Sequence, residues 1–170
     1  MGMVTTWISW MTILLPITSL SLSSGSFYIA MNDFKKERDK YLSSSLFLIF
    51  ILTLFIFFIY VVFNDFFNRL FTLSTVDISF MFFYLMFSPA FDFWILRKRY
   101  EYKLREMTIV SIVVNTVASL IAVLLVIITQ NKGLDLGRVR VISTYSFLSC
   151  VGIFFFFNLI KKGGTLFDKK

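Results

Sequence analysis

One acidic side chain stands inside an otherwise uncharged run near the middle of the chain. Asp92 lies in the run from Ile78 to Leu96, and a helix would place Tyr84 and Ser88 on the same face. The residues three and four positions away from it are Ser88, Pro89, Ile95 and Leu96, and none is a cation that could form a local salt bridge. Acidic residues within membrane spans are rare and mark ion or substrate pathways. We therefore predict a cavity-lining or ion-linked role for Asp92, with one alternative. Arg97 follows closely, which would also suit a position in the wet membrane interface.

A second polar residue stands in the run from Met107 to Gln130. Asn115 shares a face of small residues with Ser111 and Ser119. In lipid, such a face lets helices approach, and an amide can form a hydrogen bond between them. We expect Asn115 either to make an interhelical hydrogen bond or to contact a substrate.

The N-terminal run carries a stripe of small polar residues at alternating spacings of four and three, which places them on one helix face. The stripe consists of Thr5, Ser9, Thr12, Pro16, Ser19, Ser23 and Ser26. It lies opposite apolar residues such as Met11 and Leu14. Two interpretations remain open: a helix-packing face, or the polar wall of a water-accessible cavity in a helix that Pro16 bends.

The chain lacks the residues that common catalytic and metal-binding sites require. The chain has no histidine and a single cysteine, Cys150, which excludes the usual zinc sites and Ser-His-Asp catalysis. No glycine-rich phosphate loop or nucleophile elbow occurs. We expect neither an enzyme nor a bound metal or cofactor. The net charge of +7 is divided among short segments between apolar runs, so no continuous basic surface for nucleic acid is expected.

The elements that position these residues are transmembrane helices. The chain of 170 residues is 58% hydrophobic and only 16% charged, against about 25% charged in soluble domains. Uncharged runs of about 20 residues can span the hydrocarbon core. The predicted helices cover approximately residues 4–32, 46–63, 78–96, 107–130 and 141–160. We predict an all-α, polytopic transmembrane bundle of about five helices in one domain covering residues 1–170, in contact with the lipid bilayer. Asp77 falls in the connection after the second helix, where we expect it to be exposed.

The basic residues predict the orientation. The first connection, the third connection and the C-terminal tail hold 13 Lys and Arg residues, and the other connections hold 4. Short loops rich in Lys and Arg stay in the cytoplasm. This asymmetry predicts an external N-terminus and a cytoplasmic C-terminus.

Three segments carry a resemblance to a known family. They read SSGSFYIAMNDFKKERDKYLSSS, FWILRKRYEYKLREMTIVSIVVN and KKGGTLFDKK. With their order and spacing, they resemble the bacterial oligosaccharide repeat-unit flippases of the O-antigen and capsule type, in the MOP exporter superfamily. The resemblance extends over nearly the whole chain and aligns it with helices two to six of the first of two lobes.

The resemblance implies a function and a location. Such flippases move undecaprenyl-diphosphate-linked oligosaccharides across the bacterial inner membrane for polysaccharide biosynthesis, and polymerase or export proteins are further partners that it suggests. Their cavities are often lined by cations that contact the diphosphate. No Lys or Arg stands in the middle of a predicted span, so we assign diphosphate binding to no residue of this chain. The alternative is a small, non-transporting membrane subunit of a larger complex.

Overall fold

The computed structural model describes residues 2–22, 25–34, 37–132 and 134–163, with the side chains of residues 25, 26 and 132 left out. Every regular element within these ranges is helical, which confirms the all-α prediction. The helices are α1 (Met3–Thr18), α2 (Gly25–Asp33), α3 (Arg38–Val62), α4 (Asn64–Phe71), α5 (Thr75–Tyr100), α6 (Leu104–Thr129) and α7 (Leu136–Gly163), with a 3-10 turn at Gln130–Lys132.

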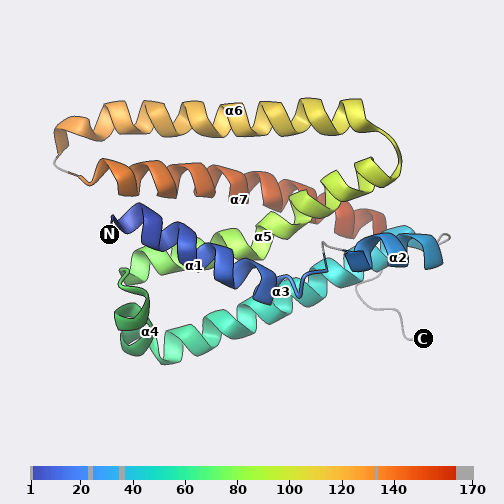
Figure 1. The fold of residues 1–170 in the computed structure, drawn as a ribbon, viewed down its shortest axis with the longest axis horizontal. Helices are drawn as coiled ribbons and strands as arrows, with labels where there is room; N and C mark the ends of the chain where they lie inside the picture. The colour runs from blue at the N-terminus through green and yellow to red at the C-terminus, as the bar shows by residue number, and fades with distance from the viewer. Residues whose placement is uncertain (1, 23–24, 35–36, 133, 164–170) are drawn as a thin grey trace.

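Within the described residues, four helices are long and apolar enough to cross a membrane: α3, α5, α6 and α7. Their apolar segments agree with the last four predicted spans. The helices begin three to eight residues before these spans, and α5 and α7 also end four and three residues after them. The chain is therefore a multi-pass membrane protein. Helix α7 lies at the centre and packs most closely against α5, then against α6 and α3, as Figure 1 shows.

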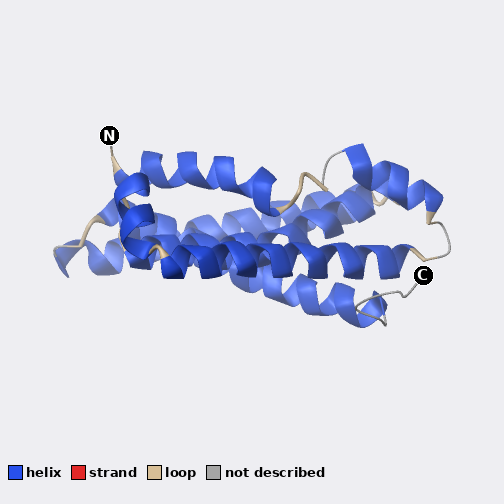
Figure 2. Ribbon diagram, turned by 90° about the horizontal axis from the view of Figure 1, so that it is seen from below, coloured by secondary structure: helices blue, strands red, loops and turns tan. Residues whose placement is uncertain are grey.

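The first predicted span is wrong as a single helix, because residues 4–32 form two helices, α1 and α2. Helix α1 continues past Pro16 and ends where Leu20 and Ser21 take left-handed backbone angles, with φ values of 51° and 50°. The Ser21 amide donates to the carbonyl of Pro16 at 3.1 Å, which closes the last turn. Serine competes for backbone hydrogen bonds, so this serine-rich segment supports a helix poorly. Figure 2 shows α1 and α2 following one another on one side of the long helices.

Two clusters of buried side chains hold the bundle together. One joins Phe27 and Met31 of α2 to α3, α5 and α7, with Phe27 stacked on Phe93 at a centroid distance of 5.7 Å. The other joins α1 to α3, α4, α5 and α7 around Trp7 and Met81, both fully buried. The two halves of the interrupted N-terminal span thus pack onto opposite halves of the bundle.

The predicted connections fall at two ends of the bundle. The α2–α3 segment, the α5–α6 turn and the end of α7 lie at one end, and the N-terminus, α4 and the α6–α7 turn lie at the other (Figure 1). At the basic end, Arg97 pairs with Asp39 and with Glu101, the latter at 2.9 Å. Partial burial opposes the charge on Glu101, but Arg97 and Lys103 outweigh it and hold the pKa of Glu101 below its ordinary value. The lysines at 35, 36, 169 and 170 lie outside the described residues.

Candidate functional site

The four residues predicted from the sequence as cavity candidates meet in one cavity between α5, α6 and α7. Tyr84, Ser88 and Asp92 occupy one face of α5, as their spacing predicts. Asn115 of α6 faces the same space, which measures about 210 Å³. The remaining lining residues are Phe91, Ile95 and Leu148.

Asp92 has no ion-pair partner among the described residues. Its side chain is half-buried, and it stands eight residues before the end of α5. At a rise of 1.5 Å per residue, this is about 12 Å along the helix axis. The Oγ atom of Ser88 is also buried without a hydrogen-bond partner among the described residues. The cavity therefore combines an uncompensated carboxylate with an unsatisfied hydroxyl, which is the arrangement that a cation, a proton or a polar ligand would complete.

Among the described residues, Asn115 makes no interhelical hydrogen bond, which was one of the two roles that the sequence suggests. Its Nδ2 donates to the carbonyl of Ser111, one turn earlier in the same helix, at 2.8 Å. Helix α6 packs mainly on α7 and much less on α5, and the Asn115 side chain is exposed.

A second cavity, mostly apolar but with four polar residues in its lining, lies on the same side of α7, nearer the end that carries the N-terminus. It measures about 420 Å³ and lies between α1, α6 and α7. Its polar lining residues are Ser119, Arg140, Thr144 and Tyr145. Tyr145 separates the two cavities, since its ring contacts Trp7 of α1 at 4.4 Å and Tyr84 at 4.8 Å between centroids.

The two cavities together form a polar track along α6 and α7. On α7, the track residues Gly137, Arg140, Thr144 and Leu148 recur at spacings of three and four, so they occupy one helix face. On α6, Asn115, Ser119 and Ala122 do the same. The last predicted helix begins at residue 141, so the sequence interpretation left Arg140 in the connection before it and gave Thr144 and Tyr145 no role. The four-residue offset of Thr144 from Arg140 was the available signal, but it becomes visible only once α7 is known to begin at Leu136.

The N-terminal polar stripe is divided by the structure. Thr5, Ser9, Thr12 and Pro16 are exposed along the outer face of α1, while Trp7, Val4 and Met11 of the same helix pack into the bundle. The stripe residues of α1 are therefore not a packing face within this chain. Ser19 is buried at the end of the helix. Ser23 and the side chain of Ser26 lie outside the described residues.

Asp77 is not the exposed loop residue that the sequence suggests. It lies in the first turn of α5 and is buried. Its Oδ1 accepts from Nε of Arg138 at 2.8 Å, and its Oδ2 accepts from the Ser74 hydroxyl at 2.6 Å. Its backbone carbonyl also accepts from the indole Nε1 of Trp7 at 3.2 Å. Asp77 thus joins α1, α5 and α7 at the end of the bundle opposite the basic cluster.

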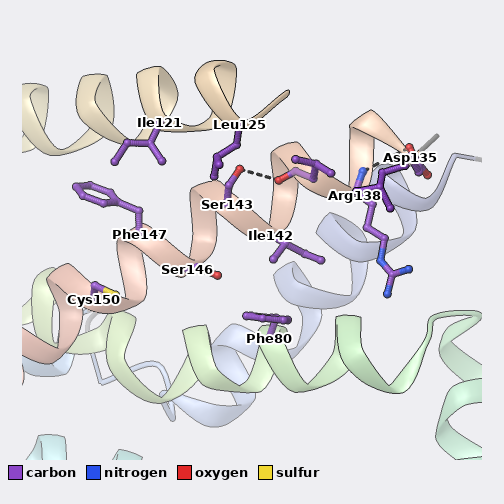
Figure 3. Close-up of a pocket in the computed structure, with 12 residues that line it drawn as sticks. Phe80, Ile121, Leu125, Asp135, Arg138, Ile142, Ser143, Ser146, Phe147 and Cys150 are labelled. Atoms are coloured by element: carbon purple, nitrogen blue, oxygen red, sulfur yellow. Dashed lines mark hydrogen bonds between the residues drawn. The ribbon is translucent and has the colours of Figure 1, made fainter. Parts of the chain in front are cut away.

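A third cavity is apolar and contains none of the predicted site residues. It measures about 610 Å³ and lies between α5, α6 and α7. Figure 3 shows Arg138 and Asp135 at one end of it and Cys150 at the other. No family model, curated protein or solved structure matches this chain.

Proposed function

We propose that this chain forms one lobe of a membrane transporter in which the polar track between α5, α6 and α7 belongs to the translocation pathway. The observation that carries the proposal is the convergence of Asp92, Ser88, Tyr84 and Asn115 in one cavity within apolar, membrane-length helices. Ionisable residues at such places are energetically costly and commonly mark substrate or ion pathways.

The interrupted N-terminal span supports the same proposal. Transporters form binding sites at discontinuous helices, because irregular backbone at membrane depth is tolerated where it lines a cavity or is buried in protein. Here the break after Ser19 lies between two halves that together run the length of the bundle. The hydroxyl groups on the outer face of α1 would contact water in a cavity or face a second lobe.

The proposed substrate class comes from the sequence resemblance. Flippases of the O-antigen and capsule type move lipid-linked oligosaccharides, and a polar track beside an apolar, lipid-facing surface suits a substrate with a sugar head and an isoprenoid tail. Arg140, at one end of the track, could meet a diphosphate, because guanidinium groups form paired hydrogen bonds with phosphate oxygens. The proposed location is the bacterial inner membrane.

Substitution of Asn115 tests the role of the track. In a full transporter carrying this segment, Asn115→Leu should reduce oligosaccharide translocation in proteoliposomes about tenfold, the effect of losing about 1.4 kcal/mol of interaction. Thr116→Leu is the matched control, because Thr116 is exposed and lines neither polar cavity. Equal translocation by the two variants would show that the polar track is not part of the translocation pathway.

The alternative function, a non-transporting subunit of a larger membrane complex, is favoured by one observation, the exposed hydroxyl face of α1. Such a face would then pack on a partner helix. In that case Ser9→Leu would abolish co-purification of the partner, while Asn115→Leu would have no effect on the complex.

Residues 1–170 alone should not transport, because alternating access requires two lobes that move against each other. Complementation of a flippase-deletion strain is the direct assay. Surface polysaccharide restored by this segment without a second-lobe fragment would contradict the one-lobe proposal.

A further inference from the structure

The large apolar cavity lies on the opposite side of α7 from the polar track. Its α7 residues, including Arg138, Ile142, Ser146 and Cys150, recur every four positions and so follow one helix face. Successive residues of an α-helix are rotated by about 100°, which places this face roughly opposite the one with Arg140 and Thr144. The two cavities are therefore separate surfaces.

The cavity is an open groove with a mainly hydrocarbon lining, and the Ser146 Oγ in its wall is buried without a hydrogen-bond partner among the described residues. Its walls are Phe80 of α5 and Ile121 and Leu125 of α6, and its floor is α7. The Ser143 hydroxyl, which also lines it, donates to the carbonyl of Val139 at 2.6 Å (Figure 3) and so offers little polarity to the groove. Because α6 packs mainly on α7 and much less on α5, the two walls leave the groove open to the surrounding bilayer.

The groove has the depth of one membrane leaflet. It extends along α7 from Arg138 to Cys150. At 1.5 Å per residue, these twelve steps cover about 18 Å. Half of a hydrocarbon core of about 30 Å is about 15 Å, so an acyl chain that starts at Arg138 would reach Cys150 near the centre of the bilayer.

A positively charged side chain, Arg138, and a negatively charged one, Asp135, lie at the mouth of the groove. The Arg138 side chain is 39% exposed although its Nε pairs with Asp77, and its Nη1 makes no hydrogen bond with a described residue. Asp135 is exposed, and its Oδ1 accepts from the amide of Gly137 at 2.9 Å. A cation and an anion side by side complement a zwitterion better than they complement a purely anionic group.

We infer that this groove binds one phosphatidylethanolamine molecule of the bilayer. One acyl chain lies between Phe80, Ile121 and Phe147, the lipid phosphate contacts Arg138, and the lipid ammonium contacts Asp135. Guanidinium groups donate charge-assisted hydrogen bonds to phosphate oxygens. The inference is independent of transport, since the groove shares no surface with the polar track.

Native mass spectrometry of the purified full chain tests the inference, with phosphatidylethanolamine and phosphatidylglycerol supplied in equal amounts. The wild-type chain should retain phosphatidylethanolamine about tenfold over phosphatidylglycerol, which corresponds to about 1.4 kcal/mol. Ser146→Trp should fill the groove and abolish the retention. Leu120→Trp is the control, because Leu120 is 57% exposed on another face of α6.

The Asp135→Asn substitution distinguishes the contribution of the lipid head group from that of the acyl chain. Asparagine caps a helix as well as aspartate does, so the fold is preserved and total lipid binding persists. The preference for phosphatidylethanolamine over phosphatidylglycerol should fall about tenfold, the effect of about 1.4 kcal/mol. Equal retention of the two lipids by the wild-type chain, or equal retention by Ser146→Trp and Leu120→Trp, would overturn the inference, and preferential retention of phosphatidylglycerol would exclude the zwitterionic occupant.

Discussion

Arg138 and Asp77, which are 61 residues apart in the sequence, form an ion pair with Nε and Oδ1 2.8 Å apart. The pair joins the first turns of α7 and α5. The Asp77 side chain is 4% exposed and the Arg138 side chain is 39% exposed. The carboxylate is therefore withdrawn from water and depends on Arg138 and Ser74 for compensation, while Arg138 keeps access to solvent or to lipid head groups.

Asp77→Asn should destabilise the bundle by about 1–3 kcal/mol. The amide keeps the shape of the side chain but removes the negative charge that compensates Arg138. Because Arg138 is partly exposed, water compensates part of its charge, which limits the loss of folding free energy. Unfolding in mixed micelles with a denaturing detergent measures the effect. Asp65→Asn, at an exposed position of α4, should change the free energy of unfolding by less than about 0.5 kcal/mol. A loss of the same size in both variants would contradict a structural role for the pair.

Gly152→Ala should separate the most closely packed pair of helices. A Cβ atom at this position would lie 2.5 Å from the carbonyl oxygen of Phe87, which belongs to the α5 backbone and cannot rotate away. We expect a loss of about 1–3 kcal/mol in the free energy of unfolding. Cys150→Ala, two residues earlier at an exposed position, should be close to neutral. Equal stability of the two variants would show that α5 and α7 can move apart at no cost.

The connections around Lys36 and Lys98 should be cytoplasmic, and the turn around Lys132 should be external. The distribution of 13 cations against 4 is the reason. Cysteines introduced at single positions of a Cys150→Ala chain can be labelled in intact cells. Modification of position 36 by a membrane-impermeant reagent applied from outside would reverse the predicted orientation.

Asp92→Asn should impair oligosaccharide export by a full transporter more than Asp65→Asn does. The substitution removes a carboxylate that has no ion-pair partner among the described residues and lines the polar cavity, whereas Asp65 is exposed on α4. Asp77→Asn, which the sequence alone would suggest as the neutral control, is unsuitable because of the ion pair with Arg138. Surface polysaccharide at matched protein levels is the measurement. Equal export by the two variants would assign Asp92 to the membrane interface.

Relationships within one helix could be predicted from the sequence. The common face of Tyr84, Ser88 and Asp92 follows from spacings of four residues, and the α5 helix bears it out. The four long spans follow from apolar runs, because backbone polar groups in lipid must be satisfied within the helix. Both arguments depend only on neighbouring residues and on the surrounding solvent.

The position at which the N-terminal span breaks was not predictable from hydropathy. Small hydroxyl residues are tolerated within membrane helices, so the stripe from Thr5 to Ser26 fits a continuous helix as well as an interrupted one. The break depends on the left-handed backbone of Leu20 and Ser21 and on the docking of α1 and α2 onto separate clusters of buried side chains.

Relationships between helices were decided by the tertiary structure alone. Three relationships depend on which helices are neighbours and how they are rotated. Asn115 and Asp92 line one cavity, Tyr145 lies between two cavities, and Asp77 is buried against Arg138. Periodicity defines the face of a helix on which a residue lies, but it carries no information about the element that faces it. That choice is made by close packing, as where the α5 backbone approaches Gly152 of α7.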